Sequence, residues 1–242
     1  MQNIINRIPP LFRVSLLALL IMGLVYAYHN YKVSEEVREV TSFHAIEVGG
    51  LMNVYLQQGE VEQLKVRADD HILPQVKTKV EEGVLKIYTE GLIRGERIKE
   101  AFITYVHLDS LHAAGVGTIT SRGVLPLDSF VLRASKASEV RLQIQGQALE
   151  LSMHDNANVQ LAGAINAFYA RIDHHGDLMA YNLKANKADI QLHTGPQSPG
   201  VARIHVLDSL WADVRGPRYL YYLGEPRFVH KNAEGQGKIL KK

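Results

Sequence analysis

The stretch FVLRASKASEVRLQIQGQA, residues 130–148, decides the fold of this chain because its pattern recurs in the next two stretches of equal length. These are LELSMHDNANVQLAGAINA, residues 149–167, and FYARIDHHGDLMAYNLKAN, residues 168–186. Each stretch begins with three alternating apolar residues and carries a second apolar pair ten and twelve positions later: Phe130/Leu132/Ala134 with Val140/Leu142, Leu149/Leu151/Met153 with Val159/Leu161, and Phe168/Ala170/Ile172 with Leu178/Ala180. Such alternation indicates β-strands, so each 19-residue unit predicts two short strands.

A fixed short period of this kind predicts an all-β fold, a parallel β-helix or solenoid with ~19-residue rungs. The preceding unit, Leu111 to Phe130, fits the same period, and the two later units lengthen to 20 and 22 residues. The insertion is expected at Gly195–Gly200, because proline cannot donate to a strand ladder and that segment should bulge out. Small or turn-forming residues separate the two runs, as in Lys136–Ser138 and Asn156–Asn158, and these are the expected corners.

The chain before the repeats alternates as well, and it predicts further strands from Phe43 onward. One short helix is expected near 70–80, because Ile72, Val76 and Val80 stand four apart and Gly83 follows. The expected organisation is a signal anchor or signal peptide at 1–28, a polar linker at 29–42, a β-rich portion with the short helix at 43–106, and β-helix repeats with a C-terminal cap at 107–242, with 43–242 forming one continuous domain.

The amino terminus carries an export signal. Arg7 and Arg13 precede the uncharged run VSLLALLIMGLVYAY, and a positive flank before an apolar run predicts that the rest of the chain is exported. Residues 1–28 are therefore expected to form an N-terminal hydrophobic membrane helix, contacting the membrane over 11–28, or a signal peptide cleaved after Ala27. The first form anchors the domain to the inner membrane in the periplasm, and the second releases it as a periplasmic or secreted protein.

Composition excludes several classes of function. The chain is 46% hydrophobic and 21% charged, with a formal net charge of +2 and scattered basic residues, which argues against nucleic-acid binding. It contains no cysteine, so disulfides, thiol catalysis, cysteine zinc sites and a lipoprotein anchor are excluded.

Both ends of the folded part resemble a known family. The resemblance rests on FHAIEVGGLMNVYLQQG at 43–59, Gly115-Val-Gly117, Tyr222-Leu-Gly-Glu-Pro226 and Gly235-Gln-Gly237-Lys-Ile239. These stretches resemble the head GIN domain family of auto-transporter adhesin heads, over about residues 43 to 240. The resemblance implies an exported bacterial protein with a β-helical fold and no established enzymatic activity. The corners depart from the family's Gly-Ser-Gly pattern, as in Ser-Lys-Ala-Ser at 135–138.

One column of the aligned units is a candidate metal site. His154, Asp173 and His193 fall just after the first strand of successive units, and imidazole and carboxylate are ligands for a divalent metal such as zinc. The two histidines are two rungs apart, roughly 9 to 10 Å. A solvated or mutually hydrogen-bonded ladder is the alternative interpretation.

Aromatic and basic residues gather near the carboxyl end and form the interface candidates: Trp211, Arg215, Arg218, Tyr219, Tyr221, Tyr222 and Phe228. Such mixtures are enriched at interfaces and in glycan contacts, and they also cover the open end of a solenoid. Both interpretations remain open.

The sequence points to a non-enzymatic envelope binding or scaffold protein, an adhesin-head-like β-helix presented outside the cytoplasmic membrane. No residues are assigned as catalytic or cofactor-binding, because the period brings no pair of carboxylates to positions suited to general acid and base. An envelope protein, a second copy of the chain or a surface glycan are the expected partners. The alternatives are a polysaccharide-active enzyme with a shallow groove and a self-assembling structural β-solenoid.

Overall fold

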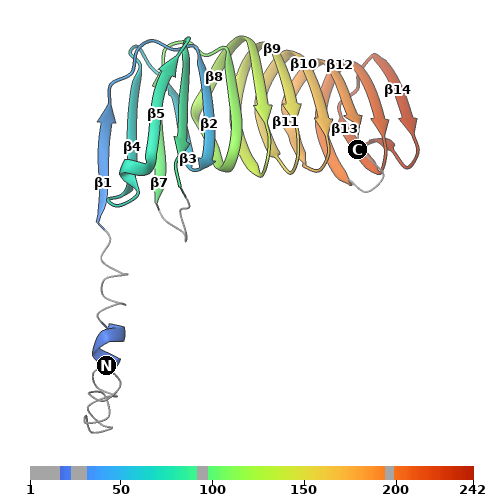
Figure 1. The fold of residues 1–242 in the computed structure, drawn as a ribbon. Coiled ribbons are helices and arrows are strands. Elements are labelled where there is room, and N and C mark those ends of the chain that lie inside the picture. The colour runs from blue at the N-terminus through green and yellow to red at the C-terminus, as the bar shows by residue number, and fades with distance from the viewer. Residues whose placement is uncertain (1–16, 23–31, 92–97, 194–198) are drawn as a thin grey trace.

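The structure, a computed structural model, describes residues 17–22, 32–91, 98–193 and 199–242. Within these residues the chain winds into a β-solenoid of about six turns, seen as a stack of rungs in Figure 1. Its elements are β1 (Val33–Arg38), β2 (Ala45–Leu51), β3 (Asn53–Gln58), β4 (Gln63–Asp69), the 3-10 turn η1 (Leu73–Gln75), β5 (Val76–Glu81), β6 (Val84–Thr89), β7 (Lys99–Tyr105), β8 (Ser110–Ala134), β9 (Ser138–Met153), β10 (Asn158–Asp173), β11 (Leu178–His193), β12 (Gly200–Arg215), β13 (Arg218–Leu223), β14 (Phe228–Glu234) and β15 (Lys238–Lys241).

The long strands turn a corner within their length, so that each supplies one segment to each of two opposing faces (Figure 1). We call these face A and face B. Face A contains residues 138–146, 158–165, 178–185 and 200–206, and face B contains residues 148–153, 167–173, 187–193 and 209–215. Towards the amino terminus, β3, β7, β4 and β1 extend face A, and β2, β6 and β5 extend face B. Successive rungs pair in parallel, as expected for a coil wound in one direction.

The predicted 19-residue repeat is confirmed by the strand register. Phe130 pairs with Leu149, Leu149 with Phe168, Phe168 with Ala188 and Ala188 with Leu210. All five side chains point into the core between the two faces and are almost fully buried. These apolar residues, one from each rung, therefore form a single column of buried side chains that runs along the stack.

The corners between rungs hold non-glycine residues in left-handed backbone conformations. Lys136, Asp155 and His174 have φ values of 59°, 57° and 69° and are spaced 19 residues apart. The Lys136 N–H donates a hydrogen bond to Asp155 Oδ2 at 3.0 Å, which ties one corner to the next. The bulky corners noted in the sequence thus carry conformational strain that glycine would avoid.

The folded part begins earlier than the sequence indicates. Residues 29–42 are expected to be a polar linker, but strand β1 lies within that segment and pairs antiparallel with β4. The strand has no apolar pattern because its residues are mostly exposed. Polar contacts hold it instead, including a hydrogen bond of 2.7 Å from Arg38 Nη1 to the Val76 carbonyl and an ion pair of 3.1 Å between Lys65 and Glu35.

The short helix expected near 70–80 is confirmed only as the turn η1. Val76 and Val80, which the four-residue spacing places on that helix, belong to β5. β5 pairs antiparallel with β6 through Glu82 and Gly83, whose φ values of 51° and 75° suit a tight hairpin turn.

Two expectations fall largely outside the described residues. The membrane segment at 11–28 contributes only the helical residues 17–22, and none of the described helices has the length and apolar character to cross a membrane. Of the insertion predicted at 195–200, only residues 199 and 200 are described.

The rung formed by β14 and β15 carries exposed lysines at positions in register with buried core residues. Lys231 pairs with Ala212, a buried core residue, and so occupies an inward-facing column. Its ammonium lies 4.7 Å from the centroid of the Tyr222 ring. Lys241, which pairs with Tyr222 in the next column, makes an ion pair with Glu225. Inward-facing lysines oppose the addition of another strand at this edge.

Candidate functional site

The interface candidates do not form one surface. Arg218 and Tyr222 are buried, with Arg218 0% exposed. Tyr219 and Tyr221 lie on the face A side, where their rings stack at 6.2 Å between centroids. The remaining three, Trp211, Arg215 and Phe228, lie on the face B side. The sequence cluster therefore divides between two faces and the core.

Arg218 has a structural role that its sequence neighbourhood does not reveal. Its guanidinium donates hydrogen bonds to the carbonyls of His174 and, at 2.7 Å, Gly176. Burial lowers the pKa of Arg218, and the carboxylates of Asp177 and Asp173 partly oppose that shift. A Cβ at Gly200 would lie 2.5 Å from the Arg218 Nη2 atom, so glycine leaves the room that the side chain needs. Arg218 thus joins the lengthened rung to the corner before it.

The candidate metal ligands are neighbours in pairs. His154 Nδ1 lies 3.6 Å from Asp173 Oδ2, and Asp173 pairs in register with His193. The imidazole of His193 instead contacts Asp213, at 3.1 Å from Nε2 to Oδ2. Burial raises the pKa of Asp213, but the hydrogen bonds from Arg215 and the adjacent imidazole of His193 outweigh burial, and the pKa is lowered overall. In the described part of the chain, no group of three or more such side chains is placed to hold a metal ion.

Face B carries a second feature, an outward-facing column in which acids and aromatic residues alternate. Glu150 pairs with Tyr169, Tyr169 with Asp189 and Asp189 with Trp211, one residue from each of four consecutive rungs. We call Glu150, Tyr169, Asp189 and Trp211 the acid–aromatic column. Tyr169 and Trp211 are 52% and 49% exposed. Two large aromatic side chains thus lie half in solvent, about 10 Å apart along the stack.

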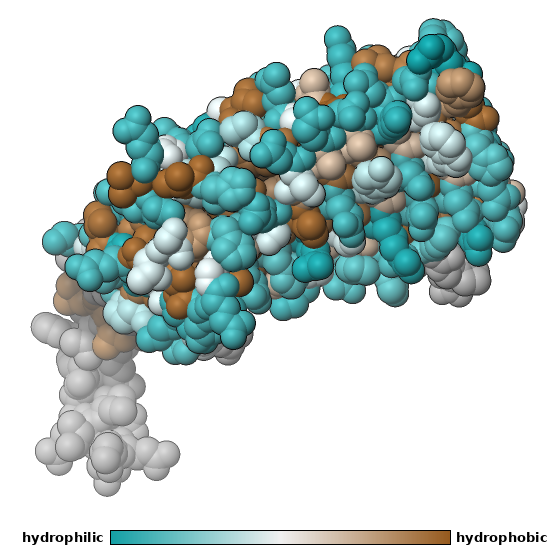
Figure 2. All heavy atoms as spheres, turned by 90° about the horizontal axis from the view of Figure 1, so that it is seen from above, coloured by the Kyte–Doolittle hydropathy of each residue, from teal (hydrophilic) through white to brown (hydrophobic). Residues whose placement is uncertain are grey.

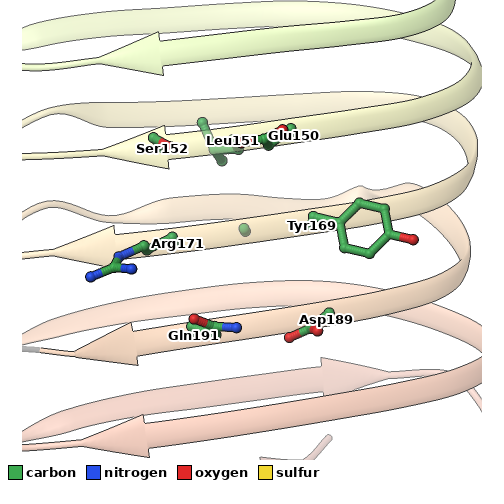
Figure 3. A pocket seen from close by; sticks show the side chains of 8 residues that line it. Glu150, Leu151, Ser152, Tyr169, Arg171, Asp189 and Gln191 are labelled. Carbon is green, nitrogen blue, oxygen red and sulfur yellow. The ribbon is translucent and has the colours of Figure 1, made fainter.

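Two hollows flank Tyr169 along this column. One, of about 290 Å³, is lined by residues of three rungs that include Glu150, Tyr169 and Asp189 (Figure 3). The other, of about 240 Å³, lies between Tyr169, Asp189 and Trp211. Both hollows share Tyr169 and Asp189, so they adjoin along the column, and we refer to the two together as the groove. In Figure 3 the Tyr169 ring is seen face-on, beside the acids of the neighbouring rungs.

A second outward column supplies polar groups to the same groove. Arg171 pairs in register with Ser152 on one side and Gln191 on the other, and all three line the larger hollow. Asp173 holds the guanidinium of Arg171 at 3.2 Å from Nε. The groove therefore presents hydroxyl, amide, guanidinium and carboxylate groups next to aromatic faces. Figure 2, which views the stack from above, shows hydrophilic and smaller hydrophobic areas interspersed along its length.

The two acids of the column lie apart, and aromatic and hydrogen-bonding groups surround them. Glu150 is exposed and Asp189 is half-buried on the outer surface of a sheet, about 10 Å apart across two rungs. Exposed aromatic groups with nearby hydrogen-bonding side chains are typical of recognition surfaces.

Sequence reasoning identified Trp211 but missed Glu150, Tyr169, Asp189 and Arg171 as a group. The signal was present in the repeat, because the outward positions align in register just as the inward ones do. Tyr169 follows Glu150 by 19 residues, and the next two members follow at the lengthened intervals of 20 and 22. Aligning outward positions by the same period would have placed all four in one column.

Fold and site together define a β-solenoid with an open, outward-facing groove on one face. The chain belongs to the family described as putative auto-transporter adhesin, head GIN domain, which matches residues 42–226. That confirms the resemblance seen in the sequence. A search of curated proteins gave no match to the chain.

Solved structures share this fold. A putative adhesin from Bacteroides fragilis is 20% identical, with a TM-score of 0.77, and the match covers 87% of this chain and 97% of that chain. A protein described as a putative lipid binding protein, from Parabacteroides distasonis, is 19% identical with a TM-score of 0.68, over 88% of this chain and 98% of that one. A putative adhesin from Parabacteroides merdae is 18% identical with a TM-score of 0.63, over 88% and 97%. These likenesses concern the fold alone.

Proposed function

We propose that this protein is a non-enzymatic binding module of the bacterial cell envelope that recognises a surface molecule through face B. The observation that carries the proposal is the pair of half-exposed rings, Tyr169 and Trp211, beside two adjoining hollows. Tyrosine, tryptophan and arginine are the residue types that most often dominate binding energy at interfaces. Covering the exposed halves of both rings would contribute about 5 kcal/mol before the costs of association.

The family and the sequence both support a location outside the cytoplasm. An adhesin-like family is expected at the cell surface or in the envelope. The apolar run within 11–28 supports export, either as an inner-membrane anchor with the domain in the periplasm or as a signal peptide cleaved after Ala27. In both forms, face B would meet molecules outside the cytoplasmic membrane.

A structural polymer is a weaker candidate. End-to-end stacking would bury the last described rung, where Lys231 shares a register with a core residue and Lys241 makes an ion pair with Glu225, beside the exposed side chains of Phe228, Val229 and Leu240. Charged groups at inward positions would have to be desolvated by a stacked partner. Recognition through a face of the solenoid therefore accounts for the structure better than assembly through its end.

Binding to bacterial envelope preparations tests the proposal. The full chain, purified in mild detergent, is expected to bind washed envelopes saturably, and the double variant Tyr169→Ala/Trp211→Ala is expected to bind at least about tenfold more weakly. The matched control is Tyr219→Ala/Tyr221→Ala, which removes two aromatic rings from face A. Equal binding by all three proteins, or a greater loss in the control, would refute the assignment to face B.

A further inference from the structure

We infer that the acid–aromatic column binds a neutral polysaccharide with vicinal hydroxyl groups, laid along the axis of the solenoid. The inference rests on the proposed function and names the chemistry of its ligand. The column runs across four consecutive rungs, from Glu150 to Trp211, so a ligand that follows it must be extended rather than compact.

The aromatic positions suit stacked sugar rings. Tyr169 and Trp211 lie on alternate rungs, about 10 Å apart because adjacent strands are ~4.8 Å apart. One rung spacing is close to the length of one pyranose unit in an extended chain, so rings two units apart can meet the two side chains. The face of an aromatic ring is electron-rich, and a pyranose ring presents a face of weakly positive C–H groups that complements it.

The acids alternate with the aromatic rings and suit the hydroxyl groups of the same chain. A carboxylate offers two acceptor oxygens, so Asp189 can accept hydrogen bonds from two neighbouring hydroxyls of one sugar. Asp189 lines both hollows. Glu150 lines the larger hollow and lies on the opposite side of Tyr169 from Asp189. Gln191 and Ser152 add groups that both donate and accept. Each sugar ring that stacks on an aromatic side chain would thus find polar partners on the adjoining rung.

The charged side chains that line the groove favour a neutral ligand over a polyanion or a strongly cationic peptide. The groove is lined by two acids, Glu150 and Asp189, and two bases, Arg171 and Lys187. Arg171 also contacts Asp173, and with this third acid the five side chains carry a net charge of only −1. A polyanion would meet the acids directly on the column, and a strongly cationic peptide would meet the bases beside it. The balance therefore favours an uncharged chain that binds by stacking and hydrogen bonding.

Chemical treatment of the envelope separates this inference from the proposed function. Periodate cleaves vicinal diols and so destroys the proposed ligand, whereas proteinase K removes protein partners. The full chain is tested for binding to untreated, periodate-treated and proteinase-treated envelopes. Loss of binding after periodate treatment supports the inference. Binding that resists periodate and is lost with proteinase overturns it and leaves the proposed function standing, while absence of binding to untreated envelopes overturns both.

Two variants of Asp189 test the neutral character of the ligand. Asp189→Ala is expected to weaken binding about tenfold, because the acceptor groups are lost. Asp189→Asn retains one acceptor and a donor, and is expected to stay within about threefold of the unchanged protein. A cationic ligand would respond to the loss of charge, so equal weakening by both variants would contradict the inference. Asp128→Asn, on another rung, is the matched control for removing one acid.

Discussion

At the scale of single residues, the most informative side chain is Arg218, which sequence analysis placed among the interface candidates. The structure buries it completely, with its guanidinium bonded to the His174 and Gly176 carbonyls. A buried arginine in this position saturates backbone acceptors that would otherwise lack partners. It lies next to Gly200 and thereby links the start of β12 to the corner at His174.

Replacing Arg218 by methionine keeps much of the apolar stem but removes the donors. We expect Arg218→Met to lower the free energy of unfolding by about 2–3 kcal/mol, because two carbonyls lose their partners in a buried setting. Urea denaturation followed by circular dichroism measures the change. Arg215→Met, at an exposed arginine three residues earlier, serves as the control and should leave the unfolding curve close to that of the unchanged protein. Coincident unfolding curves for Arg218→Met and the unchanged protein would disprove the structural role.

At the scale of elements, the sequence predicts the buried columns of the repeat well and the strands outside the repeat poorly. The repeat in Phe130, Leu149 and Phe168 is strong because each residue fills the same interior position on its own rung. Strand β1 has no such apolar pattern in its sequence, because backbone pairing with β4 and surface ion pairs hold it. The spacing of Ile72, Val76 and Val80 fits a helix equally well, and only the hairpin turn at Glu82 and Gly83 decides for a strand.

The corner at Lys136 offers a test of strain in an element. A non-glycine residue at φ 59° pays a steric cost of about 1–2 kcal/mol, partly offset because glycine is more flexible in the unfolded chain. We therefore expect Lys136→Gly to raise the free energy of unfolding by up to about 1 kcal/mol. Lys136→Ala keeps the strain and should give no gain. If alanine stabilises as much as glycine, the charge of Lys136 and not its backbone conformation is responsible.

At the scale of the whole molecule, the solenoid turns a periodic sequence into parallel columns of side chains. Inward columns form the core, while outward columns present a repeated spacing to solvent, and face B uses one of them to alternate acids with aromatic rings. This explains why clustering along the chain was a poor guide to the candidate site. Tyr219 and Tyr221 are close to Trp211 in sequence but lie on the other face, whereas Tyr169 is 42 residues away and shares its column.

The most direct measurement uses Trp211, the single tryptophan of the chain, as a reporter within the acid–aromatic column. Envelope polysaccharide is solubilised and titrated into the full chain while tryptophan emission is recorded. The account predicts a saturable change in emission, reduced at least about tenfold in apparent affinity by Tyr169→Ala and left unchanged by Tyr219→Ala. Binding of the polysaccharide, detected by sedimentation, without any change in Trp211 emission would place the ligand elsewhere and contradict the account.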